Sequence, residues 1–347
     1  MATPLDLLNA PEFADDRLTE SINIPPYVTG RPAQLGIFRD TPIHLTHVLL
    51  GISGDEITII PSRERGGPAN KNMRNDRQTT FFKVPHFPLD DAITPADLQN
   101  LTVFGDGYVM QTLANVVNEK LATMRLKHDA THNHLDWGAL NGMVYDAAGV
   151  LLTDIYDAFD LTQESVNFAL GTPSTDVAAK NRAVKASIRK QLRGAPSNGV
   201  RVFASPEWFD AYVNHATVKD AYKYYAANGQ QQNPARDDIT DGFTHAGLTI
   251  ERIDEEFSYR QENGTFATRE AVPAGEALAV PLGTPYFKRY VAPPDTIQDA
   301  NKAPAPGSKI FVSTDDLPHG KGRDVHTESN VLPICQRPQI IIRLTNP

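Results

Sequence analysis

The chain has 347 residues, of which 40% are hydrophobic and 22% charged, so it can bury a sizeable core in one domain or more. This composition excludes wholesale disorder, and a net charge of −9 excludes a uniformly basic, histone-like nucleic-acid binder. A single cysteine, Cys335, excludes an intramolecular disulfide, and its apolar neighbours predict a buried thiol in a reducing compartment.

Residues 1–47 are predicted to form an extended arm. Prolines recur along it and are expected to interrupt any helix longer than two turns, while its apolar residues follow no regular period. Such a segment usually lies across another surface. No basic stretch followed by an apolar core opens the chain, and no apolar run approaches ~18 residues. We therefore expect a soluble protein, made in a cytoplasm, with no membrane partner.

Residues 48–90 are predicted to form a long two-stranded hairpin. Strand patterns at 48–52 and 56–60 precede a basic, glycine-containing stretch, and 78–84 is the expected returning strand. Ordering such a stretch costs entropy that its own core does not offset, so a neighbouring subunit is expected to supply the contacts. The arginines would make charge-assisted contacts with acidic patches, and the glycines would allow the turn. The candidate subunit-contact residues are Arg63, Arg65, Gly66, Gly67, Arg74 and Arg77.

A long helix is the main predicted element in the middle of the chain. Thr94, Pro95 and Asp97 form a helix-start pattern, and from about 108 to 137 apolar residues recur with helical spacing. Such a helix would run ~45 Å at 1.5 Å per residue, which suggests a spine. A hairpin is predicted next, with strands at 143–146 and 150–152 and Gly149 free to adopt positive φ.

A basic helix is predicted at 177–192, ending at Gly194. Two interpretations stay open: a face that contacts nucleic acid, or a solvated helix face. It carries no acid, and its cations are Lys180, Arg182, Lys185, Arg189, Lys190 and Arg193.

The remaining pattern is mixed and favours an α+β fold over a doubly wound sheet. Strands are expected at 200–204, 248–253, 276–281 and 339–344, and Ser205-Pro206 predicts a helix start after the first of them. Adjacent acids, such as those at 90–91 and 315–316, are expected in solvated turns.

His128 and His132 come nearest to a catalytic motif. Two histidines at i and i+4 share a helix face, as zinc ligands do, and Asp129 stands where a zinc hydrolase would carry a glutamate base. No third ligand follows at a recognised spacing, so an exposed polar helix end, or one at a subunit contact, is the competing interpretation. The sequence contains no phosphate-binding loop and no nucleophile elbow, so no catalytic residue, metal or cofactor is assigned.

Five segments in a fixed order carry a family resemblance. They are SRERGGPANKNMRNDRQTTFFKVPHF, DAITPADLQNL, LNGMVYDAAGVLLTDIYDAF, VFASPEWFDAYVNHATVKDAY and SNVLPICQRPQIII. Together they resemble the lambda-like major capsid protein E family of tailed phages and prophages, from about residue 40 to the end. No single segment is decisive, whereas their joint order is specific.

The resemblance implies the Hong Kong 97-like capsid fold. Its parts would be an N-terminal arm at 1–47, an extended loop at 48–90, and a peripheral domain with a spine helix at 91–195. An axial domain would occupy 196–300, and 301–347 would return to the peripheral domain. Some relatives cross-link a lysine to an asparagine between subunits, whereas the lambda-like branch uses a decoration protein instead.

The function implied by the resemblance is structural, not enzymatic. The chain would assemble with itself through hexamers and pentamers into an icosahedral virion shell, built in the host cytoplasm. Further partners would be a scaffold protein, a portal, a decoration protein, and packaged double-stranded DNA held by weak nonspecific contact. Two alternatives stay open: a cytoplasmic metal-dependent hydrolase using His128 and His132, and another virion component such as a tail-tube or baseplate protein.

Overall fold

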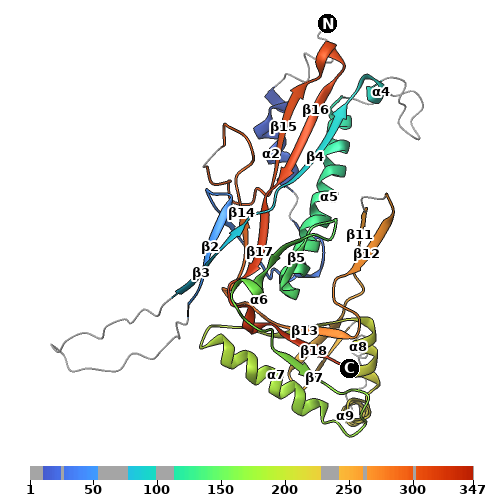
Figure 1. The fold of residues 1–347 in the computed structure, drawn as a ribbon. Helices are drawn as coiled ribbons and strands as arrows, with labels where there is room; N and C mark the ends of the chain where they lie inside the picture. The colour runs from blue at the N-terminus through green and yellow to red at the C-terminus, as the bar shows by residue number, and fades with distance from the viewer. Residues whose placement is uncertain are drawn as a thin grey trace, which may run out of the picture. The chain divides into compact units, whose positions relative to one another are not determined.

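The computed structural model describes residues 11–24, 27–53, 77–98, 113–227, 242–260, 264–299 and 302–346, and it mixes helices with strands (Figure 1). The predicted α+β fold is confirmed. The chain divides into two compact units, described separately below. Unit 1 comprises Met1–Val48, Phe82–Asn133 and Arg289–Pro333, and unit 2 comprises Leu49–Phe81, His134–Lys288 and Ile334–Pro347.

Unit 1 is organised by an antiparallel sheet with strand order β15-β16-β4. Its strands are β15 (Ile310–Asp316), β16 (Arg323–Ser329) and β4 (Phe87–Ile93). In register, Thr327 of β16 lies opposite both Val312 and Leu89. Because side chains alternate between the faces of a strand, these three share the face that packs against helices α2 (Asp15–Asn23) and α5 (Leu113–Asn141).

The core of unit 1 forms where these helices meet the sheet. Every third or fourth residue of α5 points inward, which is the spacing of one helix face. The buried apolar cluster consists of Leu18, Ile22, Ile93, Val116, Val117, Leu121, Met124, Ile310, Val312 and Val325.

Two smaller sheets and four short helical segments are the other described elements of residues 11–98 and 287–335. Strand order β1-β14-β17 gives a second sheet, and β2 pairs with β3. Their bounds are β1 (Arg39–Pro42), β14 (Phe287–Val291), β17 (Val331–Cys335), β2 (His47–Ser53) and β3 (Arg77–Lys83). The short helical segments are η1 (Pro11–Phe13), α3 (Arg31–Gln34), α4 (Pro95–Leu98) and η3 (Pro318–Gly320).

Unit 2 is built on a six-stranded mixed sheet with order β7-β18-β13-β8-β10-β9. Strands β8 and β10 are parallel, as are β18 and β7, and the other neighbours are antiparallel. The strands are β7 (Ser165–Asn167), β18 (Ile342–Thr345), β13 (Glu276–Leu282), β8 (Gly199–Ala204), β10 (Leu248–Arg252) and β9 (Gly242–His245).

Helices and two hairpins surround this sheet. The helices are α6 (Ile155–Ala158), α7 (Val177–Leu192), α8 (Pro206–Asn214), α9 (Ala216–Ala227) and the 3₁₀ turn η4 (Pro338–Ile340). The hairpins pair β5 (Met143–Tyr145) with β6 (Leu151–Asp154), and β11 (Glu256–Arg260) with β12 (Phe266–Glu270). Phe168, Trp208 and Tyr212 pack ring against ring in the core, with Trp208 and Tyr212 stacked at 5.0 Å between centroids.

Several predicted elements are confirmed together with their capping chemistry. The Asp176 carboxylate accepts the Ala179 N–H at the start of α7, and the helix ends at Leu192 as predicted. Ser205 caps α8 by accepting the Trp208 N–H. Gly149 has a φ of 84° in the predicted β5–β6 hairpin. Cys335 is fully buried, and burial raises the pKa of its thiol to about 12.

Other local predictions are wrong. The N-terminal arm contains α2, a helix of 9 residues and two and a half turns, which fits between Pro11 and Pro25 with two acids in its first turn. The closing strand begins at Ile342 rather than Gln339, because Pro338–Ile340 forms a 3₁₀ turn. The acid pairs at 90–91 and 315–316 lie within strands β4 and β15 instead of turns.

Candidate functional site

The predicted subunit-contact residues fall mostly outside the described residues. This holds for Arg63, Arg65, Gly66, Gly67 and Arg74. The predicted strand at 56–60 lies outside as well. Arg77 is the first residue of β3, which pairs with β2, so the predicted return of the loop as a strand is confirmed at this end. The assignment of these six residues to subunit contacts stays a prediction.

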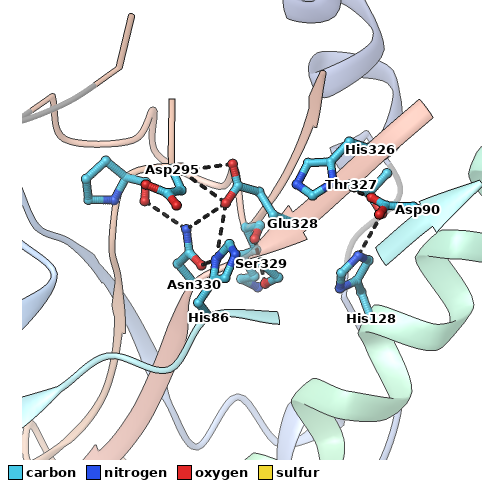
Figure 2. A network of polar contacts seen from close by, with 11 residues as sticks. His86, Asp90, His128, Asp295, His326, Thr327, Glu328, Ser329 and Asn330 are labelled. Atoms are coloured by element: carbon cyan, nitrogen blue, oxygen red, sulfur yellow. Dashed lines mark hydrogen bonds and ion pairs between the residues drawn. The ribbon is translucent and has the colours of Figure 1, made fainter. Parts of the chain in front are cut away.

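His128 and His132 are buried, so the expectation of an exposed helix end is wrong. Their residues are 3% and 1% exposed, and α5 continues to Asn141 beyond them. His128 Nε2 lies 3.0 Å from Thr327 Oγ1, and His132 Nε2 lies 2.7 Å from Ser329 Oγ. Both hydroxyls stand on the inward face of β16, and Figure 2 shows the first of these contacts.

The two hydroxyls determine which nitrogen of each histidine carries the proton. A hydroxyl has one hydrogen to donate. Thr327 Oγ1 donates to the Leu89 carbonyl at 3.1 Å, and Ser329 Oγ donates to the Lys309 carbonyl at 2.8 Å. Each hydroxyl oxygen is therefore left to accept from its histidine. Both rings are accordingly in the Nε2–H form, tying α5 to β16 as structural hydrogen-bond donors.

Burial also keeps both rings neutral. Desolvation lowers the pKa of His128 to about 4, with the nearby His326 adding to the effect. Desolvation lowers the pKa of His132 well below its ordinary value, and the positive charges of Arg289, Lys309 and Arg125 act in the same direction.

This neighbourhood does not provide a metal site. His132 lines a cavity of about 290 Å³ together with Arg125, Asp129 and Lys309. The Asp129 carboxylate lies 3.4 Å from Arg125 Nε, so an ion pair already engages the residue predicted as the base. Among the described residues, no group of three His, Cys, Asp or Glu side chains is placed to hold a metal ion.

A second polar network ties a surface segment to the opposite side of β16 (Figure 2). Glu328, only 2% exposed, accepts the Asp295 backbone N–H at 2.9 Å. Asn330 donates to the Pro293 carbonyl at 2.8 Å, and its side-chain oxygen lies 2.8 Å from His86 Nδ1. These contacts fasten the connection after β14 onto the sheet and satisfy the buried carboxylate.

The N-terminal helix α2 protects the edge of the same sheet. Strand β15 is an edge strand, and unpaired edges invite pairing with other chains. Thr19 Oγ1 accepts the Val312 N–H at 2.9 Å, and the Asn23 amide donates to the Ile310 carbonyl at 2.7 Å. The Asn23 side-chain oxygen also accepts the Lys309 N–H at 3.0 Å. Side chains of α2 thus take the place of a fourth strand.

Several large apolar side chains remain exposed, and these are the stronger candidates for subunit contacts. Val150, Leu151 and Leu152 follow one another at β6 with exposures of 58%, 47% and 37%. Three consecutive exposed apolar residues are unusual in a monomer unless they meet a partner. Phe266 of β12 and Phe81 of β3 are 77% and 69% exposed.

Sequence reasoning missed the partners of the two histidines. A pair of histidines at i and i+4 has the same spacing whether it binds zinc or donates to a strand. The available signal was the alternation in β16, where Thr327 and Ser329 place two hydroxyls on the same face as the buried Val325. Among the described residues, no helix is long and apolar enough to cross a membrane.

Comparisons with known proteins agree along nearly the whole chain. Residues 16–346 match the family described as phage major capsid protein E. The major capsid protein of Pseudomonas phage KPP10 is 30% identical, with 97% of each chain covered. The major capsid protein of Salmonella phage Felix O1 is 25% identical, with 94% of each covered. A crystal structure assigned as the capsid protein of an E. coli CFT073 prophage superposes with a TM-score of 0.55 at 12% identity, covering 96% of this chain and 99% of that one.

Proposed function

The chain belongs to the phage major capsid protein E family, and we propose that it builds the icosahedral head of a tailed phage from hexamers and pentamers of itself. Its function is that of a major capsid protein, and its fold is Hong Kong 97-like. The observation that carries the proposal is the family match over residues 16–346. The metal-hydrolase alternative is not supported.

The proposal assigns the parts of the chain to parts of a shell subunit. Residues 1–47 are the N-terminal arm, 48–90 the extended loop, 91–195 the peripheral domain with α5 as its spine, 196–300 the axial domain, and 301–347 the return to the peripheral domain. The arm and the loop spread contacts over several neighbours, so that each contact is modest and assembly can correct errors. The exposed apolar run at 150–152, in the proposed peripheral domain, is a further candidate contact, because a neighbour would bury it.

The proposed partners follow from the same role. The shell forms in the host cytoplasm and becomes part of the virion, with a scaffold protein, a portal and a decoration protein as further partners. Double-stranded DNA is the proposed cargo, held by weak nonspecific contact. The proposal includes no catalytic step and no cofactor.

Negative-stain electron microscopy with sedimentation, on the chain expressed alone, tests the proposal. Closed shells or capsomer rings are the expected result. Tubes, or rings of one fixed size, would favour a tail-tube or baseplate component instead. A chain that stays monomeric, even together with the other head proteins of its phage, would contradict the proposal.

A charge-reversal pair tests the predicted contact residues separately. Arg65→Glu is expected to leave a folded subunit that cannot close shells, because its charge-assisted contact with a neighbour becomes repulsive. Lys127→Glu makes the same change in charge at an exposed position of α5 and serves as the control. Normal particles from Arg65→Glu would remove Arg65 from the assembly contacts.

A further inference from the structure

Helix α7 of unit 2 separates an apolar buried side from a cationic outer side. Its buried residues recur with helical spacing and include Val177, Val184 and Ile188. Arg182, Arg189 and Lys190 are exposed, and Lys180 and Lys185 are half-buried. The helix contains no acid over its 16 residues, although the whole chain carries a net charge of −9. The outer side of α7 is therefore positively charged within an acidic chain.

The helix dipole and ion pairs within the subunit explain only some of these cationic side chains. The helix dipole favours cations in the last turn, which suits Arg189 and Lys190. It disfavours Lys180, which lies in the first turn of the helix. Arg182 lies 3.7 Å from Asp176, but both side chains are about two-thirds exposed, at 64% and 65%, and such pairs contribute little. The nearby Glu164 carboxylate is engaged by the Ser187 hydroxyl at 2.6 Å.

The outer side of α7 has the form expected for a rod-like polyanion. Exposed Ala186 lies between Arg182 and Arg189 on one side and Lys190 on the other, and exposed Ala183 lies beside Lys190 around the helix, so the helix backbone can approach a partner closely. Arg182 and Arg189 are two turns apart, or ~10 Å along the axis, which spans about three phosphates of one DNA strand.

The composition of the outer side of α7 favours DNA over a protein as its partner. It exposes no large apolar side chain, whereas protein interfaces have an apolar core. It exposes no Asn and no aromatic ring, and its long cationic side chains suit contacts with phosphate oxygens. We propose that the α7 basic face, formed by Lys180, Arg182, Lys185, Arg189 and Lys190, binds the backbone of double-stranded DNA without sequence preference. The inference rests on the proposed function and identifies which surface of the subunit meets the packaged genome.

Salt-dependent DNA binding by the purified chain tests the inference. Fluorescence anisotropy with a labelled random-sequence duplex gives the binding constant from 25 to 200 mM salt, values chosen to vary screening strongly. The test variant is the triple Arg182→Gln, Arg189→Gln, Lys190→Gln. The matched control, Arg17→Gln, Lys127→Gln, Lys321→Gln, removes the same charge from three exposed positions elsewhere.

The wild-type chain should bind weakly, with affinity falling as salt rises. Each phosphate contact adds ~0.9 to the slope of log K against log salt, so the triple variant should lose about 2 to 3 of that slope. Its affinity at the lowest salt should fall at least about tenfold, while the control variant stays within about twofold. Equal binding by the triple variant and the wild type would overturn the inference, as would a wild-type chain that binds no DNA.

Electron microscopy of the same variants separates this inference from the proposed function. Shells of normal size from the triple variant, with its DNA affinity lost, are the expected result. A triple variant that makes no shells but keeps its DNA affinity would show that the α7 basic face is a subunit contact, which overturns the inference. Shells from a wild-type chain without DNA affinity would overturn the inference and leave the capsid role standing.

Discussion

The sheet β15-β16-β4 and the two hairpins of unit 2 differ in how far the chain itself completes them. The sheet has its β15 edge covered by Thr19 and Asn23 and its inner hydroxyls engaged by His128 and His132. The β11–β12 hairpin, in contrast, is an isolated two-stranded sheet, with Phe266 77% exposed.

This contrast separates a region that stabilises the subunit from regions that are candidates for contacts between subunits. A two-stranded hairpin alone is marginally stable in water. The exposed run at 150–152 in the β5–β6 hairpin is similarly incomplete. We therefore expect the sheet of unit 1 to be stabilised within the subunit and the hairpins to be covered by neighbouring subunits. Variants of the two kinds of region should consequently differ in whether they lose stability or assembly.

Acid should produce the largest loss of stability, through the two buried histidines. The folded pKa of His128, about 4, lies below its ordinary value of 6.5, so the unfolded chain binds the extra proton first. Stability is thus fully present above pH 6.5 and is lost as pH falls toward 4. The loss from His128 alone is roughly 3 kcal/mol at 1.36 kcal/mol per pKa unit, and His132 adds to it. Urea unfolding of the subunit at several pH values measures this.

A histidine replacement isolates this effect from the carboxylates that also titrate in acid. His128→Gln keeps a hydrogen-bond donor near Thr327 and cannot titrate. Midway between pH 4 and 6.5 the slope of stability against pH should fall by up to about 1.4 kcal/mol per pH unit relative to the wild type. An unchanged slope would mean that His128 is not the neutral, buried group described above.

Truncating the core of unit 1 should have the next largest effect. Met124 is 1% exposed and belongs to the buried apolar cluster of unit 1. Met124→Ala is therefore expected to destabilise the subunit by about 2–5 kcal/mol. Leu126, two residues along the same helix, is 67% exposed. Leu126→Ala should change the unfolding free energy by less than about 0.5 kcal/mol. Similar losses in both variants would contradict the assignment of the inner face of α5.

The sequence predicts those elements whose signals are local. The stop at Gly194 lies beside α7, and Ser205-Pro206 specifies the start of α8 by an equally local signal. The sequence does not predict helix α2, because the recurring prolines obscure the start signal of the acids at 15 and 16, although the space between Pro11 and Pro25 admits a nine-residue helix.

The buried histidine contacts could not be predicted, since their partners are remote in sequence. Thr327 lies 199 residues after His128, and only the fold brings them together. Burial, which decides between a metal site and a structural hydrogen bond, is likewise a property of the packed sheet. The subunit contacts are harder still, because they depend on neighbouring copies of the chain.

Removing one hydroxyl of β16 should cost less than truncating the core. Thr327→Val keeps the shape but leaves the His128 Nε2–H and the Leu89 carbonyl without their partner, for a loss of about 1–3 kcal/mol. Thr327→Ser retains the hydroxyl and is the matched control. Nitrogen NMR of labelled histidine should also report the Nε2–H form of His128 in the wild type. An Nδ1–H form would contradict the hydrogen-bond directions assigned above.

The smallest effect on stability should occur where the effect on assembly is greatest. Leu151 is 47% exposed in the isolated subunit, so Leu151→Ser should change its unfolding free energy by less than about 0.5 kcal/mol. If a neighbour buries Val150, Leu151 and Leu152, the same variant loses that apolar contact at every copy of the interface, and the effect multiplies around a closed shell. Sedimentation should then show folded subunits in place of particles. Normal shells from Leu151→Ser would mean that the run at 150–152 stays exposed after assembly, and the contrast between self-completed and neighbour-completed regions would rest on the β11–β12 hairpin alone.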